Sequence, residues 1–478
     1  MKSHRLNLSR IGRPLLVAAV VAVLAGAGAV RSDSGSMAAA ATTTYYVSPS
    51  GSDAASGSID APWRTLTYAA GRLAAGDVLY LRGGTYREKV KFSHSGTAAA
   101  PIRISAYPGE RPVVDGNNYT IPAPTSRYSQ LVTFSGSYVQ ADGIEVRDSL
   151  WHGVVVSGSQ VTLSRIVSHD NMEAGILTWG STRAVVQDST SYNNAKSNEG
   201  GVHKYGRTSY STGISAGKGS DGTVLRGNTT YHNWGEGLST YNATNTLMER
   251  NTVYDNSKQV YISDTTGTTA RRNLVYCTPG NPYRLSSTVT QHGINLQDED
   301  QLPASSDIDI VNNLVAGCVT NFKWYPFSTK SAMRNVLVAN NTFVDATGST
   351  SDASFTIAAP RGLSHLNTRI ANNIIVQGGS KAIGSFASPT GGIAFTNNVW
   401  SKVPPSSMKG TRSVVGDPRL ARSGRLDPGA LTGSFFELLP GSPAINAAAD
   451  LSEVTGDYYG TRRPSGAAPD AGAHEYVG

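Results

Sequence analysis

The sequence predicts a β-solenoid, an all-β fold in which one short unit is stacked many times. Similar lines recur around Asn228, Asn251 and Asn273, at intervals of 23 and 22 residues. These lines combine β-branched residues with Gly, Asn and Ser, which are residues of short strands and turns. Helical repeats need units of ~33 residues or more and do not fit this period. A chain of 478 residues can then form one extended core instead of two or three globular domains.

The first 41 residues have the composition of an export signal. A basic lead precedes an apolar run at residues 15–30, and small residues follow up to Ala41. The run is shorter than the ~20 apolar residues that a membrane-spanning helix needs, and no second run of that length follows. We therefore expect residues 1–41 to be a signal peptide and leader. The mature protein is expected to be secreted and monomeric, without a membrane anchor.

The charge of the chain gives little support to nucleic-acid binding. The formal net charge is +7, but the first 41 residues carry +4 of it and leave +3 for the remainder. That remainder contains no stripe or run of Lys and Arg, so we expect no nucleic-acid partner. An anionic partner must be argued from local sites instead.

The segments on either side of the repeats are expected to close the solenoid. Residues 42–138 are predicted to hold an N-terminal cap and the first coils, with a short helix whose apolar face contains Leu66 and Ala69. Residues 139–400 would form the central coils, and the Pro- and Gly-rich residues 401–478 the last coils and a capping tail. Caps are needed because the end of a solenoid is an open sheet edge.

The recurring asparagines are expected to be structural. Asparagine tolerates the left-handed backbone of a turn, and identical amides in successive coils can form a hydrogen-bonded ladder. A ligand site is the less favoured alternative, because a feature that serves every coil does not mark one place of chemistry. Weaker copies of the repeat place Asn312, Asn340, Asn372 and Asn397 in the same setting.

The chain contains two cysteines, Cys277 and Cys318. Two cysteines are too few for a disulfide scaffold. One bridge between neighbouring coils and two small buried side chains are equally compatible with the sequence.

Aligning the coils by their glycine-led strands predicts which side chains point inward. The second and fourth positions of each strand are predicted to face the core, and alternation then turns the third and fifth outward. The predicted inward residues are Val154, Val156, Ile176, Thr178, Ile214, Ala216, Leu238, Thr240, Val260, Ile262, Ile294 and Leu296. The predicted outward stripe contains Leu177, Trp179, Ser215, Gly217, Ser239, Tyr241, Tyr261, Ser263, Asn295 and Gln297.

Several segments resemble those of a known family. They are residues 46–53, 83–86, 233–237 and 442–446, together with the asparagine lines. On these segments the chain is similar to secreted right-handed parallel β-helix proteins of the pectate-lyase-like superfamily, over nearly the whole mature chain. The resemblance implies a right-handed parallel β-helix that acts on or binds polysaccharides, because the superfamily includes lyases, hydrolases, epimerases and binding proteins.

The outward stripe contains the predicted substrate site. Trp179 and Tyr241 would flank the bare Gly217 and leave a notch with aromatic walls, and Tyr261 would extend this sugar platform. The alternative is a set of exposed aromatics that are simply good strand residues. Asn233, which precedes one of these strands, is a further candidate for substrate binding.

Cleavage of a uronate polymer by β-elimination needs a base, a group that neutralises the carboxylate, and an acid for the departing oxygen. Lys218 is the predicted base, provided that its surroundings lower its pKa; a solvated turn lysine is the alternative. The resemblance also implies a lysine base, as in lyase families 9 and 31 of this fold. In the insertion at residues 195–212, His203 or Tyr205 is the predicted acid and Arg207 the carboxylate clamp.

A second insertion, residues 279–301, adds Arg284 as another carboxylate partner. It also contains an acidic cluster, and the resemblance implies a possible calcium ion, which lyases of this superfamily often use. The spacing matches no defined calcium loop, so a solvated acidic turn is the favoured alternative. The acidic residues are Asp298, Glu299 and Asp300.

The sequence therefore predicts a secreted lyase that cleaves an acidic, uronate-containing polysaccharide by β-elimination. The first alternative is a glycoside hydrolase on the same scaffold, with Glu236 as the acid and Asp264 as the second carboxylate. The second alternative is a non-catalytic protein that binds carbohydrate or a cell surface. The sequence lacks the Asp-Pro-His-Asp motif of alginate epimerases and the paired-aspartate motif of polygalacturonases, which weakens the epimerase and hydrolase interpretations.

Overall fold

The structure is a computed structural model that describes residues 42–117, 130–202, 211–284, 289–299, 305–348, 352–387 and 391–478. Residues Ala40–Gly478 form one compact unit. The predicted signal segment, residues 1–41, lies outside the described residues. Within the described ranges, no helix has the length and hydropathy needed to cross a membrane.

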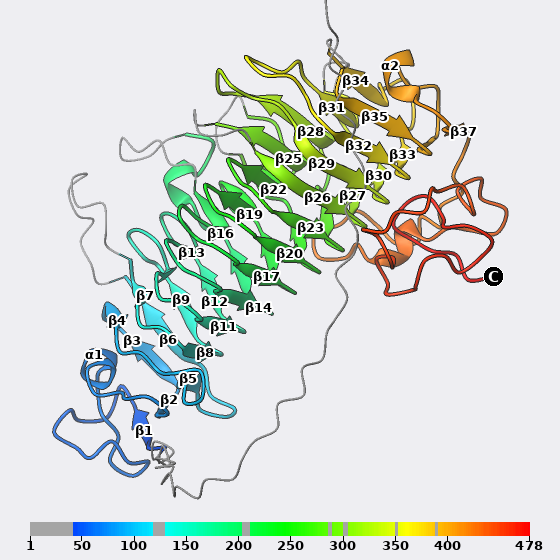
Figure 1. Ribbon diagram of the computed structural model, residues 1–478. Coiled ribbons are helices and arrows are strands. Elements are labelled where there is room, and N and C mark those ends of the chain that lie inside the picture. The colour runs from blue at the N-terminus through cyan, green and yellow to red at the C-terminus, as the bar shows by residue number, and fades with distance from the viewer. Residues whose placement is uncertain are drawn as a thin grey trace, which may run out of the picture. The chain divides into compact units, whose positions relative to one another are not determined.

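Three parallel sheets, called sheets A, B and C, wind around one apolar core (Figure 1). Sheet A consists of β1 (Thr44–Val47), β2 (Val78–Leu81), β5 (Ile102–Ala106), β8 (Val139–Asp142), β11 (Thr162–Ser164), β14 (Val185–Gln187), β17 (Val224–Arg226), β20 (Leu247–Glu249), β23 (Thr269–Arg271), β26 (Ser306–Val311), β29 (Arg334–Ala339), β32 (Thr368–Ala371) and β35 (Ile393–Thr396). Sheet B consists of β3 (Gly84–Tyr86), β6 (Pro112–Asp115), β9 (Glu145–Arg147), β12 (Val167–His169), β15 (Thr190–Tyr192), β18 (Thr229–Tyr231), β21 (Thr252–Tyr254), β24 (Leu274–Tyr276), β27 (Leu314–Ala316), β30 (Thr342–Val344), β33 (Ile374–Val376), β36 (Val399–Trp400) and β37 (Val414–Val415). Sheet C consists of β4 (Val90–Phe92), β7 (Val132–Phe134), β10 (Val154–Val156), β13 (Ile176–Thr178), β16 (Thr212–Ala216), β19 (Glu236–Tyr241), β22 (Lys258–Ser263), β25 (His292–Asp298), β28 (Thr320–Pro326), β31 (Phe355–Ile357) and β34 (Gly384–Phe386).

The predicted fold class, a right-handed parallel β-helix, is confirmed. Along the central coils each turn of the chain adds one strand to each sheet, and every strand pairs in parallel with the strands of the coils before and after it. The predicted inward register is also correct, because the first inward positions of six successive strands of sheet C are direct partners with no more than 1% exposure. These partners are Val154, Ile176, Ile214, Leu238, Val260 and Ile294.

Two columns of buried asparagines connect successive coils, as predicted. In the longer column, Asn228 and Asn251 each donate from the backbone N and from Nδ2 to Oδ1 of the next asparagine, at 2.9–3.0 Å. Each bond satisfies a buried polar group that would otherwise cost stability. The longer column continues through Asn273, Asn313, Asn341, Asn373 and Asn398. The shorter column consists of Asn171, Asn194, Asn233 and Asn256.

The weaker copies of the repeat are shifted by one residue from the predicted alignment. Asn312, Asn340, Asn372 and Asn397 precede the ladder residues and have left-handed backbones, with φ between 51° and 59°. Arg250 holds the same left-handed position before Asn251. One asparagine was expected to provide both the left-handed backbone and the ladder amide. In the structure, the left-handed backbone belongs to one residue and the ladder amide to the next. The amides of the four shifted asparagines donate instead to backbone carbonyls of the C-terminal tail.

The N-terminal end of the solenoid is covered by the predicted short helix, α1 (Leu66–Ala70). Thr65 caps it by accepting a hydrogen bond from the backbone N of Tyr68 at 3.1 Å. The Glu88 carboxylate accepts from the backbone N of Leu66 and of Thr67, which satisfies two more free amides of the first turn. The buried face of α1 packs on the first coils.

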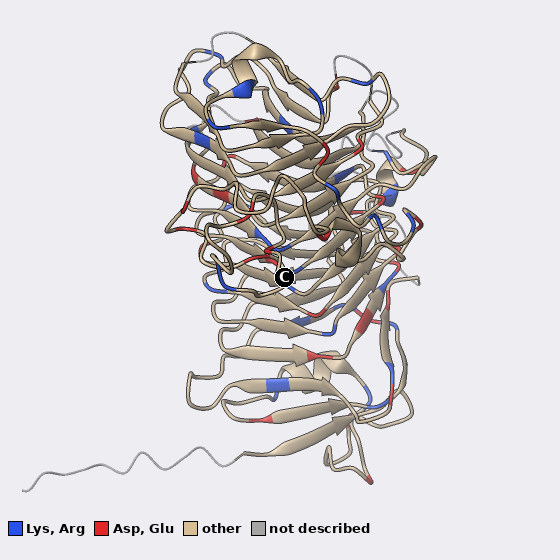
Figure 2. Cartoon of the chain, turned by 90° about the vertical axis from the view of Figure 1, so that its right-hand side faces the viewer, with Lys and Arg blue, Asp and Glu red and all other residues tan. Residues whose placement is uncertain are grey.

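The C-terminal tail, residues 416–478, packs against sheet B rather than continuing the coil. Its Leu431, Phe436 and Leu438 share an apolar cluster with Tyr276 of β24. The buried Arg463 donates to the Glu475 carboxylate and to the backbone oxygen of Gly472, both at 2.7 Å. Figure 2 views the side that carries the C-terminus and shows the tail in front of the strands. The short helices of this end are α2 (Ser406–Lys409) and the 3-10 helix η3 (Gly433–Phe436).

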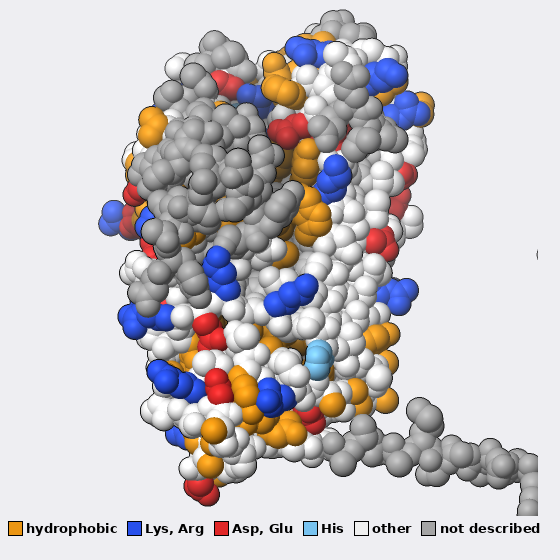
Figure 3. All heavy atoms as spheres, turned by 90° about the vertical axis from the view of Figure 1, so that its left-hand side faces the viewer, with side chains coloured by type: hydrophobic (Ala, Val, Ile, Leu, Met, Phe, Trp, Pro, Cys, Tyr) orange, Lys and Arg blue, Asp and Glu red, His pale blue; other side chains and the backbone are white. Residues whose placement is uncertain are grey.

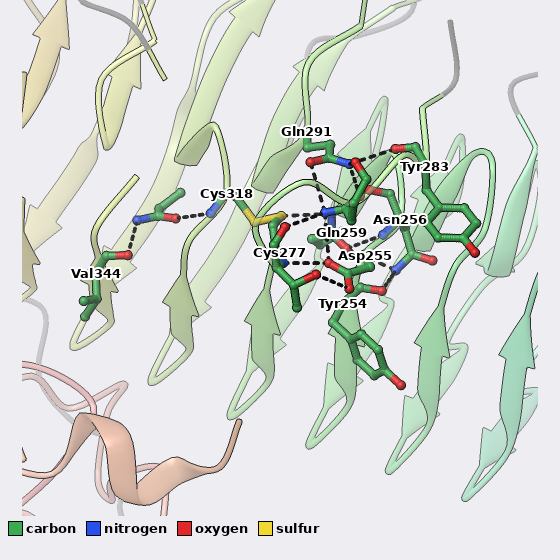
Figure 4. The surroundings of a disulfide bond; sticks show 12 residues. Tyr254, Asp255, Asn256, Gln259, Cys277, Tyr283, Gln291, Cys318 and Val344 are labelled. Atoms are coloured by element: carbon green, nitrogen blue, oxygen red, sulfur yellow. Dashed lines mark hydrogen bonds between the residues drawn. A yellow bond between two sulfur atoms is a disulfide. The ribbon is translucent and has the colours of Figure 1, made fainter. Parts of the chain in front are cut away.

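Cys277 and Cys318 form a disulfide with Cα atoms 4.7 Å apart, which resolves the two alternatives left by the sequence (Figure 4). The bridge joins the turns after β24 and β27, which are neighbours in sheet B. Gln259 lies beside it, with Nε2 3.2 Å from Sγ of Cys277. The same Gln259 accepts from Asn256 and so ends the shorter asparagine column.

Candidate functional site

The outer face of sheet C carries three contiguous pockets, together called the groove. The N-terminal pocket, of about 350 Å³, shares Trp151, His152, Leu177 and Trp179 with the central pocket, of about 370 Å³. The central pocket shares Glu299 with the C-terminal pocket, of about 320 Å³. The groove therefore follows the stacking direction over successive strands of sheet C.

Strand pairing places the charged groups of the groove in one column. Glu236 of β19 is the direct partner of Lys258 of β22, which in turn is the partner of His292 of β25. Neighbouring parallel strands lie ~4.8 Å apart, so these side chains are forced into proximity although the last lies 56 positions after the first. All three are buried at the floor of the groove.

Burial shapes the protonation of this column. It raises the pKa of Glu236 to about 8, and Lys258 beside it offsets only part of that effect. It also lowers the pKa of Lys258, although the Glu236 and Glu299 carboxylates act in the opposite direction. The pKa of His292 is lowered well below its usual range, again by burial. The groove floor thus favours a neutral amine and a protonated carboxyl more than open water does.

Tyr261 connects the central and C-terminal pockets. Its hydroxyl donates to Oε1 of Glu299 at 2.5 Å, and Nζ of Lys258 lies 4.0 Å from the centre of its ring. Burial and the nearby carboxylate raise the pKa of Tyr261 well above its usual range, so the phenol stays protonated. The ring was predicted to be an open sugar platform, but one of its faces is taken by Lys258 and only 3% of the residue is exposed. Tyr261 still lines the central pocket, so its contact with a sugar stays a prediction.

The central pocket brings together five residues singled out in the sequence. Trp179, Lys218, Glu236, Tyr241 and Tyr261 all line it, beside the bare Gly217. Trp179 is 52% exposed and can form an open wall, whereas Lys218 is exposed at the rim. Vertical register therefore assembles the predicted notch from four successive strands of sheet C and the turns that follow them.

Other predicted residues lie elsewhere. Asn233 has no exposed surface, and its Nδ2 donates to the backbone oxygen of Ser191 and to Oδ1 of Asn256 in the ladder. The prediction that it contacts substrate is therefore wrong. Arg284 is exposed but is not part of the described lining of the three pockets. His203, Tyr205 and Arg207 lie outside the described residues.

The acidic insertion does not form a metal site within the described ranges. Asp298 is buried and accepts from the backbone N of Ser305 at 2.9 Å, while Glu299 is paired with Tyr261. Asp300 lies outside the described residues. No group of three His, Cys, Asp or Glu side chains suited to a metal occurs in the described part of the chain. We derive no step through calcium from these residues.

Several groove residues were not found from the sequence. Lys258 and Lys323 line the C-terminal pocket and Glu173 lines the central one, while Glu299, predicted only as a metal ligand, lines both. A signal for Lys258 exists, because it lies two residues after the ladder residue Asn256 and Glu236 lies three residues after Asn233, and each begins an apolar strand. Asp264, predicted to partner Glu236, instead accepts from the backbone N of Glu299 and does not line a described pocket.

Figure 3 shows the side of the molecule that is at the left in Figure 1, nearest the strands of sheet C. Among the coloured atoms, Lys and Arg side chains are scattered between uncharged ones and form no continuous basic patch.

Comparisons with known proteins agree with this architecture. Residues 45–271 match the model of the Pel9A-like right-handed β-helix region. Pectate lyase PEL9 of Emericella nidulans is 31% identical over 234 residues, which are 46% of this chain and 55% of that protein. Pectate lyase L of Dickeya chrysanthemi is 30% identical over 162 residues, which are 31% of this chain and 37% of that protein. The chain thus spans about half the length, or less, of these curated relatives.

Solved structures show the same fold. The crystal structure of pectate lyase Pel9A matches with a TM-score of 0.53 at 19% identity, covering 91% of this chain and 96% of that chain. The structure of XylC with xylose matches with a TM-score of 0.54 at 12% identity, covering 91% of this chain and 98% of that chain. At these identities the likeness concerns the fold alone.

Proposed function

We propose that this right-handed parallel β-helix protein, which is similar to pectate lyases over part of its length, is a secreted polysaccharide lyase that cleaves a uronate-containing polysaccharide by β-elimination. The observation that carries this proposal is the strand register that places the buried Lys258 beside the buried Glu236 on the floor of a groove along sheet C. Secretion is supported by the composition of residues 1–41 and by the disulfide, a bond that persists in oxidising compartments.

Lys258 is the base in this proposal. Abstraction of the proton beside a uronate carboxylate requires a neutral amine, and burial lowers the pKa of Lys258 in that direction. Lys218, the base predicted from the sequence, is exposed at the rim of the central pocket, whereas Lys258 is buried. We therefore assign Lys218 to substrate contact, where its positive charge suits an anionic polymer.

The remaining roles are distributed along the groove. Lys323 lines the same pocket as Lys258 and is the other described cation there, so it suits the substrate carboxylate. Its Nζ also pairs with Asp352 at 3.2 Å, which fixes its position. Trp179 and Tyr241 would hold sugar rings in the central pocket. His203, Tyr205 and Arg207 stay proposals for the acid and the carboxylate clamp.

A product assay tests the proposal. Wild-type protein, Lys258→Ala and Lys218→Ala are incubated with polygalacturonate and with other uronate polymers, and the absorbance of the unsaturated product is followed. We expect Lys258→Ala to lose about 100-fold or more in kcat/KM, as for loss of a general base, and Lys218→Ala to lose much less. Circular dichroism checks that both variants are folded. Unchanged product formation by Lys258→Ala would remove Lys258 from the mechanism.

A glycoside hydrolase is the second candidate, because the raised pKa of Glu236 suits a general acid and Glu173 and Glu299 line the same pocket. New reducing ends without product absorbance would favour this candidate. Retention of the polymer with neither signal would favour binding alone.

A further inference from the structure

The outward column along the groove changes character from one end to the other. Thr133, Val155 and Leu177 are successive partners on β7, β10 and β13 and line the N-terminal pocket. The same column then becomes polar and finally cationic in the next two pockets. Its later members are Ser215, Ser239, Tyr261, Asn295 and Lys323.

The described lining of the N-terminal pocket contains no charged side chain. Val155 and Leu177, together with Ala174, form an apolar cluster outside the main core. Trp151 and Trp179 line the same pocket and add aromatic surface. These residues lie on the outer face of the sheet, where a solvated surface would ordinarily be polar.

The one titratable ring in this lining is held neutral. Nδ1 of His152 accepts a hydrogen bond from the backbone N of Ala174 at 3.1 Å, so that atom carries no proton. Burial also lowers the pKa of His152 to about 3. His152 therefore offers no positive charge to a carboxylate at ordinary pH.

We propose that the N-terminal pocket is a subsite for an uncharged sugar unit that presents methyl or C–H groups, so that the groove selects polymers in which such a unit lies near uronates. The inference rests on the proposed function, because the uronates would occupy the two other pockets. A carboxylate buried against Val155 and Leu177 would lose its hydration without gaining a cation from the described lining, since the next cation of the column, Lys91, lies on β4 beyond Thr133. An apolar sugar face gains from burial against aromatic walls.

A methyl-esterified uronate and a neutral 6-deoxyhexose share this chemistry, and binding measurements can distinguish them. Calorimetry would use the Lys258→Ala chain, so that oligomers are not cut. The probes are unesterified oligogalacturonate, partially methyl-esterified oligogalacturonate, and an oligomer that alternates uronate with a neutral 6-deoxyhexose. We expect at least one of the last two to bind more tightly than the first, and the tighter one identifies the source of the uncharged unit.

Charge placed at the pocket should move this preference in both directions. Ser157 is exposed and lines the N-terminal pocket, so it tolerates a longer side chain. Ser157→Arg is expected to improve the affinity for unesterified relative to esterified oligomer about fivefold, and Ser157→Glu to worsen it about fivefold, as for an exposed ion pair. The control is Gln140→Arg, an exposed position on β8 of sheet A, which should leave the ratio unchanged.

The results separate this inference from the proposed lyase activity. Absence of unsaturated product from the wild-type protein would contradict the lyase proposal, while the affinity ratios would still be measured. Tightest binding of the unesterified oligomer, equal ratios in both Ser157 variants, or no binding of any oligomer would each overturn the subsite assignment.

Discussion

Replacing one ladder asparagine should destabilise the whole solenoid, because each amide serves two coils. In Asn251→Ala, the backbone N and Nδ2 of Asn228 both lose their acceptor, the Oδ1 of residue 251. The backbone oxygen of Leu225 loses the Nδ2 donor, and Oδ1 of Asn273 loses one of its two donors but keeps the backbone N of residue 251. Four buried groups thus lose a hydrogen bond. At about 1 kcal/mol each, the free energy of unfolding should fall by about 4 kcal/mol.

The assay for Asn251→Ala is urea unfolding followed by tryptophan fluorescence and circular dichroism. The matched control is Asn245→Ala, an exposed asparagine with a left-handed backbone whose Nδ2 donates to Asp221 at 2.7 Å. This control should lose only about 1 kcal/mol, because water replaces the lost hydrogen bond and the main cost is backbone strain. Equal losses in the two variants would refute the assignment of stability to the buried column.

Two further predictions concern the C-terminal half. The disulfide closes a separation of 41 residues. In a chain-entropy treatment, the double variant Cys277→Ser, Cys318→Ser should therefore lose about 4 kcal/mol in the free energy of unfolding, measured with urea. A loss below about 1 kcal/mol would contradict this prediction. Arg463→Ala leaves the buried Glu475 carboxylate without its cation. Limited proteolysis should then release the C-terminal tail about 100-fold faster, which corresponds to about 3 kcal/mol. A cleavage rate equal to that of the wild type would show that another contact holds the tail.

The sequence was sufficient for the fold and for much of the groove. A period of about 22 residues and strict alternation determine both the stacking and the direction of each side chain, which is why Trp179, Lys218 and Tyr241 could be placed in one pocket. The one-residue shift of Asn312 arose because two consecutive asparagines occur there, although the following residues give the correct register, since Asn313-Leu-Val repeats Asn273-Leu-Val.

The roles of buried charges were harder to predict. A lysine at the start of an apolar strand is ordinarily exposed, and its place shortly after a ladder asparagine does not show that Lys258 is buried. Its protonation depends on Glu236, Glu299 and Lys323, which come from three other strands or turns. Asn233 was predicted to contact substrate because it is polar and precedes a strand of the notch. Its amide instead bonds within the asparagine ladder, so the side chain is buried and not accessible.

Activity of Glu236→Gln as a function of pH tests most directly whether Lys258 acts as a base. The Glu236 carboxylate raises the pKa of Lys258, so its removal should lower that pKa and increase the fraction of neutral amine at a given pH. We therefore predict that Glu236→Gln keeps eliminase activity and that the rising limb of kcat/KM moves to lower pH. Complete loss of cleavage at every pH would contradict a lysine base and identify Glu236 as the essential acid, and retained activity with an unshifted limb would also contradict a lysine base.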